Sequence, residues 1–176
     1  INRALWYPKD IVPEVIVVTD HREPNVTIDL QVKYANEPRI LIVSVPPGKR
    51  EAVDTGIRLA TNEIVVLVDS DTFLDEKTIY ELVKPFGNER IGGVVSDQHI
   101  HNPYDSLVNF FNALTESIKF NITIPALSVF GSVTVLAGRC AAYRKAAVMT
   151  LLTDLVNEKF LGKKCISGDD GRLTSL

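Results

Sequence analysis

Two aspartates follow a continuous apolar segment of the chain. Residues 63–68 read Glu-Ile-Val-Val-Leu-Val, and Asp69-Ser70-Asp71 comes directly after them. Successive side chains of an extended backbone alternate in direction, so Asp69 and Asp71 face one side and can bind the same divalent ion. Carboxylate oxygens select hard cations such as Mg²⁺ or Mn²⁺, whose open positions accept phosphate oxygens. In the alternative interpretation, one aspartate caps the next helix and the other lies in a solvated turn.

Further acidic residues lie far from this pair in the sequence. Asp20 ends the β-branched run of residues 14–19, and Asp169-Asp170 lie in a Gly-Asp-Asp-Gly stretch near the last residue. On its own, the late pair also fits an ordinary turn that begins a helix. The combination of three acidic positions favours a functional site more than any one of them does.

Alternating strands and helices predict how Asp20 and Asp69 are positioned. Three runs have the β-branched, apolar composition of buried parallel strands: residues 14–19, 39–45 and 63–68. Residues 49–60 have the apolar spacing of a helix, and strands joined by such a helix form a right-handed crossover in a parallel sheet. Ligands bind at the carboxyl ends of these strands. We therefore expect Asp20 and Asp69 on one rim of an α/β sheet.

The remaining segments complete one α/β domain over residues 1–176. Further helices are predicted at residues 76–86, 104–120 and 145–160, and further strands at residues 91–96, 133–137 and 141–143. The helix at 104–120 carries Phe110 and Phe111 on an apolar face, which we expect to pack into the core. Neither an internal repeat nor a low-complexity linker divides the sequence, so we expect a single compact domain.

Composition excludes several kinds of partner and architecture. The chain has 176 residues, 45% of them apolar and 23% charged, and its net charge of -3 provides no basic surface for nucleic acid. Two cysteines, Cys140 and Cys165, are too few for a disulfide framework and fit a reducing compartment. Residues 120–138 are uncharged but contain too many polar residues for an independent transmembrane helix.

The order and spacing of several segments resemble family 2 glycosyltransferases of the GT-A fold, especially the processive membrane synthases of hyaluronan, chitin and cellulose type. The matching segments are Val17–Asp20, Gly48–Ala52 with Gly56-Ile57, Val66–Thr72, Ala137–Arg144 and Ser167–Thr174. The resemblance implies a Rossmann-like, mainly parallel sheet flanked by helices. The first strand of that fold, the downstream Gln-x-x-Arg-Trp motif and the membrane spans have no counterpart here. We therefore expect a fragment of a longer, membrane-anchored protein.

The resemblance also implies an inverting transfer of a sugar from a UDP-sugar to a glycan acceptor in polysaccharide synthesis, with Mg²⁺ or Mn²⁺ as cofactor. Asp20 matches the aspartate that hydrogen-bonds the uracil ring, and Lys49 is expected near the uridine or its phosphates. Asp69 is then a contact to the nucleotide and the metal, and Asp71 is the direct metal ligand. The reaction is expected at the cytoplasmic face of a membrane, with this segment itself soluble.

At the acceptor end, the same resemblance identifies Asp170 as the general base that takes the proton from the acceptor hydroxyl. Gly138, Arg139 and Asp169 are expected to form part of the acceptor region. Inverting transfer requires one carboxylate opposite the leaving group and a Lewis acid at the departing diphosphate, and this assignment provides both.

Other functions stay open from the sequence. In a haloacid-dehalogenase-like phosphohydrolase, Asp69 would be the nucleophile and Asp169-Asp170 would bind Mg²⁺. A catalytically inactive GT-A binding module would keep the same fold without turnover. His99 and His101 alternate along the chain as metal ligands can, but no third ligand is spaced nearby. We expect these histidines at the surface or in the acceptor groove.

Overall fold

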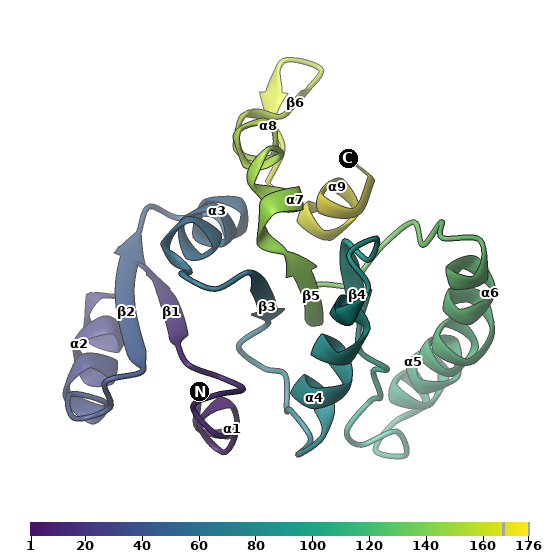
Figure 1. Ribbon diagram of the computed structural model, residues 1–176, viewed down its shortest axis with the longest axis horizontal. Coiled ribbons are helices and arrows are strands. Elements are labelled where there is room, and N and C mark those ends of the chain that lie inside the picture. Colours follow the sequence, from purple (N-terminus) through teal and green to yellow (C-terminus); the bar gives the residue numbers. More distant parts are fainter. Residues whose placement is uncertain (167, 176) are drawn as a thin grey trace.

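Two sheets lie side by side in the middle of the molecule (Figure 1). Their strands, from left to right in the view, are β2 (Ile40–Val45), β1 (Val15–Asp20), β3 (Ile64–Val68), β5 (Cys140–Arg144) and β4 (Gly93–Val95). Strands β1 and β2 are parallel, whereas β5 runs antiparallel to both β3 and β4. The computed structural model describes residues 1–166 and 168–175, so Ser167 of the last matching segment lies outside the described residues.

Helices connect the strands and flank both sheets (Figure 1). Their bounds are α1 (Asn2–Leu5), α2 (Pro24–Lys33), α3 (Lys49–Leu59), α4 (Thr78–Val83), α5 (Leu107–Ile118), α6 (Ile124–Val129), α7 (Lys145–Met149), α8 (Leu152–Asn157) and α9 (Asp169–Ser175). A 3₁₀ turn, Lys84–Gly87, extends α4, and a π turn, Lys119–Thr123, joins α5 to α6. The short strands β6 (Lys159–Phe160) and β7 (Lys163–Lys164) form a hairpin. The α/β class and GT-A type of architecture predicted from the sequence are confirmed.

Strand β5 is buried on both faces and contributes to two hydrophobic cores. Ala141 and Tyr143 pack with apolar residues of α3, α7, α8 and α9. Cys140 and Ala142 point to the opposite face and pack with α4 and the segment around Tyr7. This alternation is that of a strand covered on both sides. Because the buried strand β5 pairs with both β3 and β4, it also holds the end of β3, which Asp69 follows.

Strand β1 is held less completely than β5. All six of its residues are partly exposed, and it shares no ladder hydrogen bonds with β3 among the described residues. The two sheets are joined near the start of these strands by Glu14, whose Oε1 accepts hydrogen bonds from the backbone N–H of Thr61 at 2.7 Å and of Asn62 at 3.2 Å.

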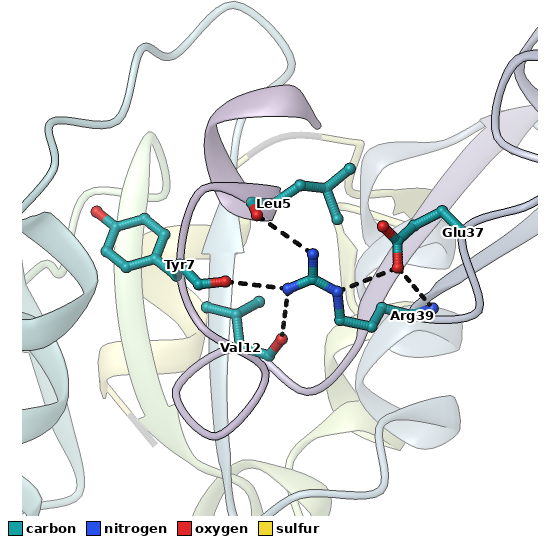
Figure 2. Close-up of polar contacts among 5 residues, drawn as sticks. All are labelled: Leu5, Tyr7, Val12, Glu37 and Arg39. Carbon is teal, nitrogen blue, oxygen red and sulfur yellow. Dashed lines mark hydrogen bonds and ion pairs between the residues drawn. The ribbon is translucent and has the colours of Figure 1, made fainter.

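Arg39, just before β2, secures the segment that precedes β1 (Figure 2). Its Nη1 donates to the carbonyl oxygens of Tyr7 at 3.0 Å and Val12 at 3.4 Å, and its Nη2 donates to that of Leu5 at 3.2 Å. The Nε atom donates to Glu37 at 3.1 Å. A planar guanidinium with several donors can bind all of these acceptors at once. The N-terminal segment is therefore attached to β2 through one side chain.

The same segment also contacts the chain that follows β3. The Tyr7 hydroxyl donates to the Asp75 carbonyl oxygen, and Arg3 Nη1 donates to the Leu74 carbonyl oxygen at 3.2 Å. Residues of this segment thus connect β2 to the loop that carries Asp71.

The helices α5 and α6 stand at one edge of the molecule (Figure 1). The face predicted to be core is exposed, with Phe111 59% exposed. The exposed apolar residues of α5, α6 and the turn between them are Leu107, Val108, Phe110, Phe111, Leu114, Ile118, Ile122 and Val129. The prediction of a core face was wrong because periodicity identifies an amphipathic helix but not the side that meets the protein. No helix within the described residues is long and apolar enough to cross a membrane.

Secondary structure differs from the prediction in two further places. Residues 133–137 form no strand, and the helix predicted at 145–160 is divided into α7, α8 and β6. The backbone turns at Leu151, whose N–H donates to Val148. This turn allows Leu152 and Leu155 to be fully buried, and core packing thereby overrides the propensity of a continuous helix.

Candidate active site

Lys49 brings together residues from distant parts of the sequence. Its Nζ lies 3.2 Å from Asp69 Oδ1 at the end of β3 and 3.4 Å from Asp169 Oδ2 in α9. The Asp169 side chain is only 7% exposed, so this ion pair is largely shielded from water. Partial burial acts to lower the pKa of Lys49, but the negative charges of Asp169, Asp69 and Asp170 outweigh it and raise the pKa. Lys49 therefore stays positively charged at the centre of the rim.

The position of Lys49 follows from the local backbone at the start of α3. Gly48 has φ 148°, and a Cβ at this position would overlap the Glu51 carboxylate. Glycine is therefore required immediately before Lys49.

The first turn of α3 is also fixed by its next two side chains. Arg50 is buried and donates from Nη1 to the Leu155 carbonyl oxygen at 2.8 Å and to Glu158 Oε2 at 2.7 Å. Glu51 forms an ion pair with Lys164 in β7. This turn thus contacts α8, the β6–β7 hairpin and, through Lys49, α9. Sequence patterns gave no signal for these contacts.

Asp170 is packed against the turn that precedes β5. The Asp170 carboxylate lies directly against the backbone of Gly138, and a Cβ on Gly138 would overlap that carboxylate. Burial raises the pKa of Asp170, and the charge of Asp169 raises it further, while the Gly138 N–H and Lys49 oppose the shift. A half-buried carboxylate with a raised pKa has the properties of a general base.

Arg139 connects three elements of the site. Its carbonyl oxygen accepts a hydrogen bond from the Asp69 N–H at 3.2 Å, which holds the end of β3 against the start of β5. Its side-chain Nη2 lies 2.7 Å from Glu116 Oε1 in α5. Glu116 was not identified from the sequence, because its role depends on how α5 packs against the sheet.

Neither Asp20 nor Asp71 joins the Lys49 cluster. Asp20 accepts hydrogen bonds from Arg22, with 2.5 Å between Nη2 and Oδ2, and these bonds lower its pKa. The Asp71 carboxylate is exposed and makes no hydrogen bond or ion pair with any described residue. Of the predicted site residues, the structure therefore brings Lys49, Asp69 and Asp169 into one ion-paired cluster, and Asp20 and Asp71 stay outside it.

The two histidines considered as ligands do not converge. His99 Nε2 lies 3.1 Å from Asp97 Oδ2, and the His101 ring stacks on Phe73 with centroids 5.5 Å apart. Within the part of the chain that the structure describes, no three His, Cys, Asp or Glu residues gather into a group able to hold a metal ion. Asp71 still fits a hard cation, because its oxygens are unengaged. Such a cation would complete its coordination with phosphate oxygens and water.

The sequence model of a known family, "Glycosyltransferase like family 2", matches residues 4–174 of this chain. The chain belongs to this family. The match includes both sheets and all of the residues described above, and it decides against the phosphohydrolase alternative.

Curated members of the family that resemble the chain include several hyaluronan synthases. Hyaluronan synthase 3 of Mus musculus is 34% identical over 131 residues, which are 73% of this chain and 24% of that protein. Hyaluronan synthase 1 of Xenopus tropicalis is 38% identical over 131 residues, 73% of this chain and 22% of that protein. Hyaluronan synthase 2 of Rattus norvegicus is 35% identical over an equal share of the chain. The chain thus spans about a quarter of the length of these relatives.

Proposed function

We propose that this chain is the catalytic unit of an inverting glycosyltransferase that moves a sugar from a UDP-sugar to a glycan acceptor in polysaccharide synthesis. The observation that carries the proposal is the Lys49 cluster. A cation held between Asp69 and Asp169 lies beside Asp170, a half-buried carboxylate with a raised pKa. Positive charge for a departing diphosphate and a base for an acceptor hydroxyl are the two requirements of such a transfer.

At the donor end, Asp20 would accept a hydrogen bond from the uracil ring, and Lys49 would bind the phosphates. Asp71, with Asp69, would hold Mg²⁺ or Mn²⁺ together with the diphosphate. When bound, the ion would supply Lewis-acid stabilisation of the leaving UDP. Asp71 supports this assignment because its carboxylate has no other partner in the described structure.

At the acceptor end, Asp170 would take the proton of the acceptor hydroxyl as the new glycosidic bond forms. The bond from the sugar to the diphosphate breaks in the same step, and UDP leaves with the bonding electrons. Asp169 would hold Lys49, while Gly138 and Arg139 would shape the acceptor side. The packing of Gly138 directly on Asp170 supports this arrangement.

The proposal extends to the setting of the chain. Residues 1–176 would act as one catalytic domain of a longer protein that works at the cytoplasmic face of a membrane, attached through segments outside this chain. Support comes from the family match across residues 4–174 and from relatives of which the matched segment is only 24%.

Calorimetry with UDP tests the donor assignment. The wild-type chain should bind UDP in the presence of Mn²⁺. Chelation or Asp71→Asn should weaken this binding by about 10- to 100-fold, because loss of a residue that only supports a metal ligand already has an effect of this size. Asp154→Asn, an exposed aspartate of α8, is the matched control and should bind normally. Equal affinity with and without chelator would contradict the metal assignment. Metal-dependent UDP binding without sugar transfer would instead support the inactive binding module.

A further inference from the structure

Gln98 is a buried polar residue beside the proposed active site, and no motif or step described above uses it. It lies in the segment after β4 and is 9% exposed. Its Nε2 donates to the carbonyl oxygen of Ala137 at 3.3 Å and to that of Cys140 at 3.4 Å. These carbonyl groups flank Gly138 and Arg139. A single side-chain amide therefore spans the turn that carries both residues.

The orientation of the Gln98 amide is determined by these partners. Carbonyl oxygens only accept hydrogen bonds, so the side-chain nitrogen must face them and the side-chain oxygen must lie on the other side. That oxygen is buried and makes no hydrogen bond within the described residues. A buried polar group without a hydrogen-bond partner destabilises the folded state. An apolar residue would avoid this cost, so the amide group points to a role that an apolar side chain could not fill.

The turn held by Gln98 contacts both chemical groups of the site. On one side, the Gly138 backbone lies directly against the Asp170 carboxylate, whose charged form the Gly138 N–H favours. On the other, the Arg139 carbonyl oxygen accepts a hydrogen bond from the Asp69 N–H at 3.2 Å. A shift of this turn would therefore move a donor away from Asp170 and change the support of Asp69.

We propose that Gln98 is a positioning residue that holds the turn from Ala137 to Cys140 so that the Gly138 N–H stays directed at the Asp170 carboxylate. The inference rests on the proposed function of Asp170 as the base. Ser96, two residues before Gln98, also donates to the Cys140 carbonyl oxygen from its backbone N–H and its hydroxyl, each at 3.1 Å, so loss of the amide releases chiefly the Ala137 end of the turn, next to Gly138. Groups that orient a base in this way are needed because small misplacements reduce the rate of proton transfer.

Displacement of the Gly138 N–H would also alter the titration of Asp170. This N–H favours the charged carboxylate, so moving it away raises the pKa of Asp170 above the value in the wild-type chain. The other groups that act on Asp170, namely Lys49, Asp169 and the Tyr143 hydroxyl, stay in place. The active, deprotonated base would then be reached only at higher pH.

Gln98→Met tests the proposal, because methionine keeps the length of the side chain and removes both donors. We expect kcat to fall about 10-fold or more with little change in the KM for the donor, since only proton transfer loses its geometry. The acid limb of the pH profile of kcat should move to higher pH. Gln98→Asn, which keeps a shorter amide, should show a smaller effect. Gln31→Met, the same change on exposed α2, should behave as wild type.

Amide hydrogen exchange at Gly138, followed by NMR, separates this inference from the proposed function because it requires no turnover. Faster exchange in Gln98→Met together with the loss of kcat supports the inference. Wild-type exchange, an unchanged pH profile, or equal losses of donor affinity and kcat would overturn it. Faster exchange in a chain whose wild type transfers no sugar would support the Gln98 contact and overturn the proposed function. If Gln98→Met does not fold, Gln98→Asn is judged by the same outcomes.

Discussion

The sheet of β3, β5 and β4 and the sheet of β1 and β2 both end in residues of the candidate site, but they hold them differently. At the first sheet, Asp69 is bound by Arg139 and Lys49, which come from distant segments. At the second, Asp20 is bound by Arg22, two residues further along the chain. Strand β5 is buried on both faces, whereas every residue of β1 is partly exposed.

This difference indicates which part of the proposed reaction depends on tertiary structure. The groups for phosphate binding and proton transfer come from α3, β3, the turn before β5, and α9. The proposed uracil contact comes from one strand end and its own turn. Substitutions at the first sheet should therefore change turnover and stability, and those at the second should change donor binding alone.

The largest effect is expected at Asp170. Asp170→Asn removes the proposed base and should lower sugar transfer by about 10²-fold or more, the usual scale for losing general base catalysis. Affinity for UDP should be nearly unchanged, because Lys49 and Asp71 are intact. Initial rates and calorimetry measure the two quantities, and Asp154→Asn on α8 is the control. Near-normal turnover in Asp170→Asn would show that the base lies elsewhere.

A substitution of Gly138 tests the packing on which the first sheet's site depends. In Gly138→Ala the new methyl group meets the Asp170 carboxylate, so α9 or the turn must move. Overpacking of this kind costs about 1–3 kcal/mol in the free energy of unfolding, and transfer should fall as well. Urea denaturation provides the measurement. Gly87→Ala, where a Cβ meets no atom within 4 Å, should have little effect, and equal stability of the two variants would contradict the observed packing.

A smaller effect is expected at the second sheet. Asp20→Asn weakens one hydrogen bond to the uracil ring, worth about 1 kcal/mol, or roughly 5-fold in the affinity for UDP. The kcat at saturating donor should stay near that of the wild type, because the Lys49 cluster has no contact with Asp20. Asp29→Asn on α2 is the control for an exposed aspartate. A fall in kcat as large as that of Asp170→Asn would remove the distinction between the two sheets.

The smallest effect concerns the pH dependence of stability. The pKa of Asp170 is raised above 3.8 in the folded chain, so the folded state binds the proton more tightly than the unfolded state. Ionisation of Asp170 therefore lowers the free energy of unfolding as the pH rises from the pKa of the unfolded state through the pKa of the folded state. Below the pKa of the unfolded state the effect is absent. Asp170→Asn cannot ionise and should gain stability relative to wild type as the pH rises. Urea denaturation of both proteins across the acid range of pH tests this prediction. A difference in the free energy of unfolding between them that does not change with pH would contradict it.

The strands were predictable because each is a continuous run of β-branched or apolar residues between turn signals. The runs at 14–19, 39–45 and 63–68 all form strands within a residue of the expected bounds. Helix α2 was missed, since its apolar residues do not form a clear stripe and Pro24 lies at its start. The outward face of α5 could not be predicted either, because periodicity carries no information about which surface is covered.

The site was predictable only as far as strand ends are concerned. Asp20 ends β1 and Asp69 follows β3, and the acidic pair that begins α9 is visible in the sequence. The contact of Lys49 with Asp169 depends on α3 and α9 packing against the same core, which no local pattern encodes. The role of Gln98 was hidden for the same reason, since its two acceptors are backbone carbonyls of a distant turn.

The anomeric configuration of the first bond formed tests the central claim most directly, namely that a carboxylate opposite the leaving group drives a single inverting displacement. Proton NMR of the product formed from an α-configured UDP-sugar in a single transfer reads this configuration. The account predicts a β-linked product, formed about 10²-fold or more slowly by Asp170→Asn. An α-linked product would contradict it, because retention cannot arise from one displacement assisted by Asp170.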